Sequence, residues 1–169
     1  GRRARIDALV DVAVAKYSPV PSRTLSWLLL RLRLAVPQWR GELKAALARA
    51  RRRLTHARVG QVDWYWTDDM VLPGDVGHDA VRLLAPFDPM VWDRTRFELF
   101  WKWPYRFEAY TPVARRKHGY YALPLLWRDQ VIGWANAANG PAGLHVDIGY
   151  AAGRVPADRG FKTALDLEI

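Results

Sequence analysis

The 169-residue sequence contains no cysteine and only two methionines. Without thiols the chain can form no disulfide framework, no zinc ribbon and no cysteine nucleophile. Its longest apolar run is far shorter than the roughly 20 residues that a membrane-spanning helix requires. Acidic residues interrupt the start of the chain, so no signal peptide is recognisable. We therefore predict a cytoplasmic protein that does not associate with a membrane.

Recognisable catalytic and metal-binding patterns are also missing. The sequence has no G-x-S-x-G, no Walker A and no G-x-G-x-x-G motif. Its four histidines are scattered, without a pair at helical spacing, so we expect no metal site and no cofactor. Asp88, Asp93 and Glu98 are more simply explained by a turn and ion pairs than by catalysis. For Glu108, which alternates with aromatics, the simplest partner is an arginine such as Arg94 or Arg106.

Acidic residues are scarce in the first part of the chain. Residues 1–60 contain 14 Lys/Arg and 3 Asp/Glu, a balance of +11, whereas residues 61–169 contain 12 and 14, a balance of −2. This asymmetry predicts a basic face directed at a polyanion. The alternative is a solvated, arginine-rich surface of the kind that GC-rich genomes encode.

Apolar residues recur at helical spacing in three early segments: 5–17, 24–34 and 41–54. The period then changes, and residues 54–59 and 62–66 are typical of two strands joined by a turn at Gly60-Gln61. Three helices followed by a β-hairpin are the outline of a winged helix, which usually binds DNA. In this interpretation the third helix and the hairpin contact phosphates through Arg49, Arg51, Arg52, Arg53 and Arg58.

The second half of the chain is predicted to be rich in strands. Acids, glycines and a proline indicate a linker over 71–80. Short strands are expected at 81–87, 105–110, 120–127, 130–137 and 143–151. Helices are expected at 91–101 and 157–169. We predict an α+β chain: a winged-helix module at 1–70 and a small antiparallel β-barrel with a C-terminal helix at 81–169.

Residues 110–121, YTPVARRKHGYY, combine cations with aromatics. If 105–110 and 120–127 are strands, this segment is the tip of a hairpin. Cations at such a tip can bind phosphates, and a tyrosine can stack on a base. The candidate contacts are Arg115, Arg116, Lys117, His118 and Tyr120, although hairpin tips are often charged for solubility alone.

Several long sequence words resemble the YcaQ-type family: PFDPMVWDR, YRFEAYTP and GYYALPLLWRDQVIG, with KYSPVPSRTLSWLLLRLRLAVPQW and RLTHARVGQVDWYW upstream. This bacterial family comprises winged-helix DNA-binding proteins, including DNA glycosylases that act on alkylated bases and interstrand crosslinks. The resemblance implies tandem winged-helix units joined to a β-barrel that clasp double-stranded DNA. It also implies a barrel hairpin that takes part in unhooking, for which residues 110–121 are the candidate. We expect a monomer.

The chain departs from this family in length, since complete members are much longer, and it resembles their C-terminal half. Their catalytic signature, Gln-apolar-Gln or Gln-apolar-Asp, lies near the N-terminus. Gln61-Val62-Asp63 spells this pattern, but its surroundings match the late hairpin. The catalytic residues therefore stay unknown, and we expect the DNA-binding part of a glycosylase without activity of its own. The alternatives are a non-catalytic DNA-binding regulator and a protein-interaction module.

Overall fold

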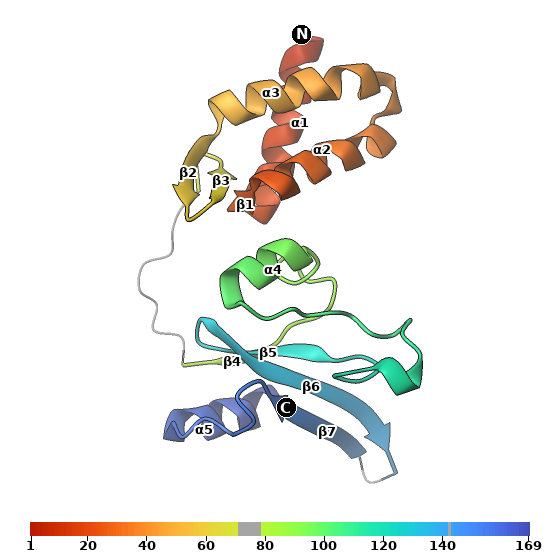
Figure 1. Cartoon of the computed structure of the whole chain (residues 1–169), viewed down its shortest axis with the longest axis vertical. Helices are drawn as coiled ribbons and strands as arrows, with labels where there is room; N and C mark the ends of the chain where they lie inside the picture. The colour runs from red at the N-terminus through yellow and green to blue at the C-terminus, as the bar shows by residue number, and fades with distance from the viewer. Residues whose placement is uncertain (71–78, 142) are drawn as a thin grey trace. The chain divides into compact units, whose positions relative to one another are not determined.

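The computed structural model describes residues 1–70, 79–141 and 143–169, which form helices and two antiparallel sheets (Figure 1). The chain divides into two compact units, Gly1–Pro73 and Gly74–Ile169. The mixture of helices and antiparallel sheets confirms the predicted α+β class. The predicted linker at 71–80 lies outside the described residues, apart from its last two positions. Where the structure is described, no helix combines the length and apolarity that crossing a membrane requires.

Three helices form most of unit 1: α1 (Arg2–Tyr17), α2 (Ser22–Ala35) and α3 (Leu43–Arg53). A 3₁₀ helix, η1 (Pro37–Glu42), connects α2 to α3. The three helices confirm the periodicity in the sequence, because each buries residues three or four positions apart against the other two. These buried residues are Ile6, Val10 and Val14 of α1, Leu25, Leu28 and Leu29 of α2, and Leu43, Ala46 and Ala50 of α3.

Unit 1 also contains a small three-stranded sheet. Strands β2 (Thr55–Val59) and β3 (Val62–Trp66) pair antiparallel, and Gly60 takes a φ of +60° in the turn between them. Glycine reaches this conformation without steric cost, and the predicted hairpin is confirmed. A two-residue strand, β1 (Val20–Pro21), pairs with the other side of β3. The sequence did not predict β1, because two residues show no periodicity.

Unit 2 is built on an antiparallel sheet with the strand order β4-β5-β6-β7. Its strands are β4 (Val81–Leu83), β5 (Leu123–Trp127), β6 (Gln130–Gly140) and β7 (Gly143–Tyr150). Helices α4 (Arg94–Trp101) and α5 (Arg159–Glu168) lie on opposite sides of this sheet (Figure 1). Successive residues of β6 serve the two sides: Val131 packs on the cluster of Val91, Phe97 and Tyr105, and Ile132 packs on the cluster that contains Phe161.

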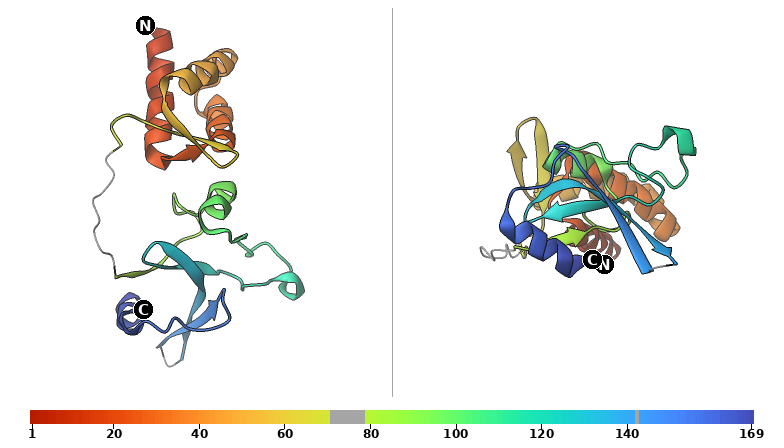
Figure 2. Two further views of the ribbon diagram at one scale, coloured as in Figure 1. Left: turned by 60° about the vertical axis from the view of Figure 1, so that its left-hand side comes forward. Right: turned by 90° about the horizontal axis from the view of Figure 1, so that it is seen from below.

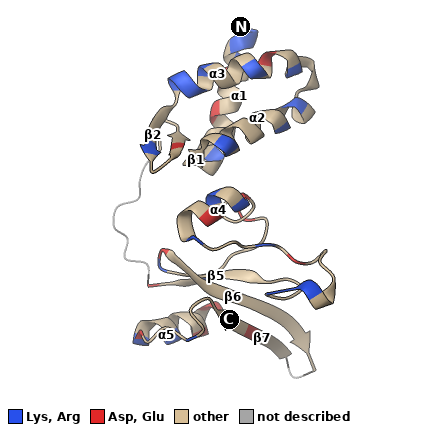
Figure 3. Ribbon diagram, viewed as in Figure 1, with Lys and Arg blue, Asp and Glu red and all other residues tan. Residues whose placement is uncertain are grey.

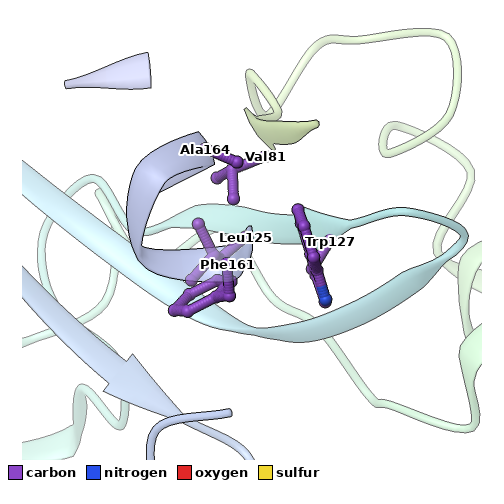
Figure 4. Close-up of a cluster of buried hydrophobic side chains, with 5 residues drawn as sticks. All are labelled: Val81, Leu125, Trp127, Phe161 and Ala164. Carbon is purple, nitrogen blue, oxygen red and sulfur yellow. The ribbon is translucent and has the colours of Figure 1, made fainter. Parts of the chain in front are cut away.

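The predicted β-barrel is wrong. In the described part of unit 2, β4 and β7 are the two edges of an open sheet and do not pair with each other. Residues 105–110, predicted as a strand, form no strand. Helix α5 covers the sheet face instead, and its Phe161 and Ala164 meet Leu125 and Trp127 (Figure 4). Because the helix buries this apolar face, the sheet does not have to close into a barrel to bury it.

Candidate nucleic-acid interface

The five arginines predicted to contact DNA from unit 1 differ in how they are paired. Arg49 donates to Asp7 of α1 through Nη2 at 2.6 Å from Oδ1 and through Nε at 3.0 Å from Oδ2. Arg53 donates in the same bidentate way to Asp11, one helical turn further along α1, at 2.6 and 2.9 Å. The hydrogen bond from Arg49 holds the pKa of Asp7 below its usual value, against the opposing effect of burial. These two arginines therefore join α3 to α1.

Arg58 is paired within the hairpin. It lies directly opposite Asp63, and its Nε and Nη2 donate to that carboxylate at 2.7 and 3.0 Å. The hydrogen bond from Arg58 lowers the pKa of Asp63, so this carboxylate is ionised at neutral pH. The Asp63 of the Gln61-Val62-Asp63 pattern is thus engaged in a cross-strand ion pair at the surface.

Arg51 and Arg52 form no ion pair with a carboxylate in the part of the chain that the structure describes. Arg51 donates to the neutral Ser26 hydroxyl at 2.9 Å. The exposed Arg52 makes no hydrogen bond or ion pair with any residue that the structure describes. All three acids of the first 60 residues are already in ion pairs: Asp7 with Arg49, Asp11 with Arg53, and Glu42 with Arg2. Figure 3 shows lysines and arginines spread along α2 and α3, where they exceed the acids.

The segment 110–121 of unit 2 is a loop and not a hairpin tip, so this prediction is wrong. It contains a short 3₁₀ helix, η2 (Val113–Arg115), and it extends away from the sheet in both views of Figure 2. Residues 105–110, before this loop, form no strand, and both Tyr105 and Glu108 are buried. The Tyr105 hydroxyl donates to the Ala122 carbonyl at 2.8 Å. This hydrogen bond connects the chain that precedes the loop to the residue that directly follows it.

Glu108 organises this loop from inside. Only 5% of its surface is exposed, and its carboxylate accepts hydrogen bonds from three successive backbone amides: Lys117 at 2.8 Å, His118 at 2.8 Å and Gly119 at 3.3 Å. Burial raises the pKa of Glu108, but the three amides outweigh burial and hold it below its usual value. The predicted arginine partner is wrong, since backbone amides take that role. A lone acid among aromatics, as in YRFEAY, is the sequence signal for such a residue.

Gly119 and Asn136 complete the anchor. Gly119 has a φ of +124°, and a Cβ at this position would collide with the Asn136 side chain. The Asn136 amide donates to the His118 carbonyl at 2.6 Å. Glycine is thus required at 119 both for its backbone angle and for its lack of a side chain.

His118, a predicted DNA contact, faces inward. It is half-buried, and its ring centroid lies 5.2 Å from that of Trp103 and 4.2 Å from that of Trp134. Burial lowers the pKa of His118, although the neighbouring Glu108 acts in the opposite direction. The His118 ring therefore packs against Trp103 and Trp134, while its backbone amide donates a hydrogen bond to Glu108.

The other predicted contacts in the loop lie at the surface. Arg115 and Lys117 are exposed, and Figure 3 shows basic residues gathered on this loop. The Arg116 guanidinium lies 5.0 Å from the ring centroid of Tyr120, and its Nε donates to the Thr111 carbonyl at 2.8 Å. The loop therefore presents cations next to exposed tyrosine on a backbone that is fixed from within.

The two carboxylates of the PFDPMVWDR segment have structural roles: Asp88 lies in the predicted turn, whereas Asp93 has a capping role that the sequence did not predict. Asp93 caps α4, since its Oδ1 accepts hydrogen bonds from the amides of Thr95 at 3.1 Å and Arg96 at 3.2 Å. Asp88 accepts from the Met90 amide at 2.7 Å in the preceding turn. These contacts explain two acids of the segment without catalysis.

Comparison with known families gives a match that spans nearly the whole chain. The model of a family described as "DNA glycosylase AlkZ-like" matches residues 1–168. No solved structure matches the chain.

Proposed function

Because this chain belongs to the AlkZ-like DNA glycosylase family, we propose that it is the DNA-binding part of a glycosylase that excises alkylated bases or unhooks interstrand crosslinks. The family match over residues 1–168 is the observation that carries this proposal. The partner is double-stranded DNA, bound by a monomer. Residues 1–70 act as a winged-helix module and residues 81–169 as a second module with its own contacts.

In unit 1, helix α3 and the β2–β3 hairpin bind the sugar-phosphate backbone. Arg51 and Arg52 are the principal contacts, because neither forms an ion pair with a described carboxylate that would compete with a phosphate. Arg49, Arg53 and Arg58 are paired with acids, so they contribute mainly by fixing the contact surface. This ranking refines the set that the charge pattern alone suggested.

In unit 2, Arg115, Arg116, Lys117 and Tyr120 approach the DNA, and His118 supports them from beneath. The support for this assignment is the loop backbone, which is hydrogen-bonded to Glu108, together with its exposed cations. A pre-ordered basic loop loses little conformational entropy when it binds.

The proposal assigns no catalytic residue in this chain. Hydrolysis of an N-glycosidic bond needs a carboxylate or amide that positions water and stabilises the positive charge on the sugar. Asp63 could supply such a group only by giving up its bidentate pair with Arg58. We therefore expect binding of DNA without base release.

Titration of a labelled duplex at two salt concentrations tests this proposal. We expect binding at low salt that weakens as salt rises, with log K falling by about 0.9 per phosphate contact for each unit of log salt. A parallel duplex that carries an N7-alkylated purine should be bound and left intact. Absence of binding at low salt would contradict the proposal and favour a protein-interaction module. A strong sequence preference without lesion preference would favour a regulator.

A further inference from the structure

Unit 2 exposes large aromatic side chains in one place. Tyr110 is 92% exposed, Phe87 is 73% exposed and Tyr121 is 42% exposed. We define the aromatic surface as Phe87, Phe107, Tyr110 and Tyr121. Large apolar side chains gathered at the surface usually mark a site of interaction, since scattered exposure would not bring four rings together.

Phe107 holds the aromatic surface together. Its ring centroid lies 5.7 Å from that of Phe87, 6.2 Å from that of Tyr110 and 5.1 Å from that of Tyr121. All three pairs are edge-to-face, with interplanar angles of 64°, 83° and 90°. In an edge-to-face pair only one of the two rings has a face covered by its partner, whereas a stacked pair covers a face of both. Phe107 itself packs against the buried cluster that contains Phe97 and Tyr105, so the exposed rings are mounted on a core.

Cations border the aromatic surface. Arg116 links its two sides, because the Nε donates to the carbonyl of Thr111, next to Tyr110, while the guanidinium lies over Tyr120, next to Tyr121. The side chains of Arg115 and Lys117 form no hydrogen bond or ion pair within the described residues. A ligand that combines flat apolar groups with negative charge would therefore complement this surface.

We propose that the aromatic surface binds single-stranded DNA, with unpaired bases stacked on Tyr110, Phe87 and Tyr121 and phosphates beside Arg115 and Lys117. This inference rests on the proposed function, that the chain binds DNA. A duplex presents base edges in its grooves, and only an unpaired base presents a face to an aromatic ring. Enzymes that extrude a target base from a duplex leave unpaired nucleotides available at that step.

The loop geometry supports stacking on Tyr110 and Tyr121. Glu108 fixes the loop through the amides of Lys117, His118 and Gly119, and the Thr111 amide donates to the Glu108 carbonyl at 2.9 Å. Both sides of the loop are thus tied to one buried residue. Rings held in place before binding lose little freedom when a base stacks on them.

The experiment compares a labelled oligothymidine of about ten nucleotides with an abasic oligomer of the same length, by fluorescence anisotropy at low salt. Wild type should prefer the oligothymidine. Tyr110→Ala and Phe87→Ala should each weaken its binding by about 5- to 100-fold and reduce the preference over the abasic oligomer. Tyr110→Phe keeps the ring and should bind like wild type.

Controls separate this proposal from the proposed function. Phe100→Ala removes a partly exposed aromatic of α4 outside the aromatic surface and should change oligothymidine binding less than about 2-fold. Binding of a plain duplex should also be unchanged by Tyr110→Ala.

If Tyr110→Ala and Phe87→Ala bind the oligothymidine like wild type while the duplex is still bound, the aromatic-surface proposal is wrong and DNA binding stands. If wild type binds neither oligothymidine nor duplex, both proposals are wrong. Equal losses of duplex and oligothymidine binding in Tyr110→Ala would also overturn the specific role for unpaired bases.

Discussion

A buried carboxylate keeps its charge only if hydrogen bonds replace the water that it loses. Glu108 shows this at the scale of one residue, because three consecutive amides converge on it from the far side of the loop. Its removal should therefore shift the backbone that carries Arg115, Arg116 and Lys117, of which the carboxylate contacts the Lys117 amide. Glu108 is a positioning residue for the surface of unit 2.

Glu108→Gln should lower the free energy of unfolding by about 1–3 kcal/mol at neutral pH, because the amides lose a charged acceptor. Urea unfolding measures this effect, and hydrogen exchange of the amides at 117–119 should become faster. The matched control is Glu98→Gln, which changes an exposed side chain on α4 and should have almost no effect. Similar losses in the two variants would contradict the assigned role.

The same variant should also change the pH dependence of stability. The folded-state pKa of Glu108 lies below its usual value, so its stabilising contribution is complete above the ordinary glutamate pKa of about 4.3. That contribution is lost as the pH falls through the lower, folded-state pKa. The difference in unfolding free energy between wild type and Glu108→Gln should therefore be constant above about pH 5 and shrink on further acidification. Unfolding measured from pH 7 to pH 3 checks this, and a difference that grows with acid would contradict it.

The arginines of α3 should separate into two classes. Arg52→Ala should weaken duplex binding and reduce the salt slope by about 0.9, the value for one phosphate contact, without changing stability. Arg49→Ala should lower stability, because it leaves Asp7 without its ion-pair partner. Binding titrations and urea unfolding of both variants check this division. It is wrong if Arg52→Ala destabilises the fold or if Arg49→Ala alters only DNA affinity.

At the scale of elements, helix α5 covers the sheet face that a closed barrel would otherwise bury. Phe161 is fully buried between α5 and the sheet, where it meets Trp127 edge-to-face at 5.5 Å (Figure 4). Phe161→Ala should therefore cost about 3–5 kcal/mol in unfolding free energy, by creating a cavity under the helix.

Leu167→Ala on the same helix is the control for Phe161→Ala, since Leu167 is 84% exposed and its truncation should change stability by less than about 0.5 kcal/mol. Urea unfolding gives both values. Comparable effects at the two positions would show that α5 does not pack on the sheet as described.

The elements that the sequence predicted correctly are those whose formation depends on the pattern of residues close together in the chain. The helices of unit 1 follow from apolar residues at helical spacing, and the β2–β3 hairpin follows from Gly60 between two alternating segments. The failures at 105–110 and at the barrel depend on distant partners. The alternation in YRFEAY is real, but Glu108 turns inward to amides nine to eleven residues away and no strand forms. Sheet closure likewise depends on whether α5 covers the sheet, which no local pattern reveals.

At the scale of the whole molecule, the sequence gives the excess of basic over acidic residues, but it did not predict which arginines form ion pairs with which acids. Asp7 and Arg49 are 42 residues apart, and so are Asp11 and Arg53. Only the helix packing shows that these arginines are engaged while Arg52 has no ion-pair partner among the described residues. Candidate sites chosen by charge alone therefore included Arg49, Arg53 and Arg58, whose charges are balanced within the chain.

The central claim is that this chain binds double-stranded DNA through uncompensated cations. The most direct measurement is the affinity of the whole chain for a labelled duplex over a series of salt concentrations, for wild type and for a variant with Arg51→Ala and Arg52→Ala combined. We expect wild type to bind at low salt, and the variant to bind more weakly with a salt slope smaller by about 1.8. A duplex affinity that does not depend on salt, or no binding at low salt, would contradict the claim.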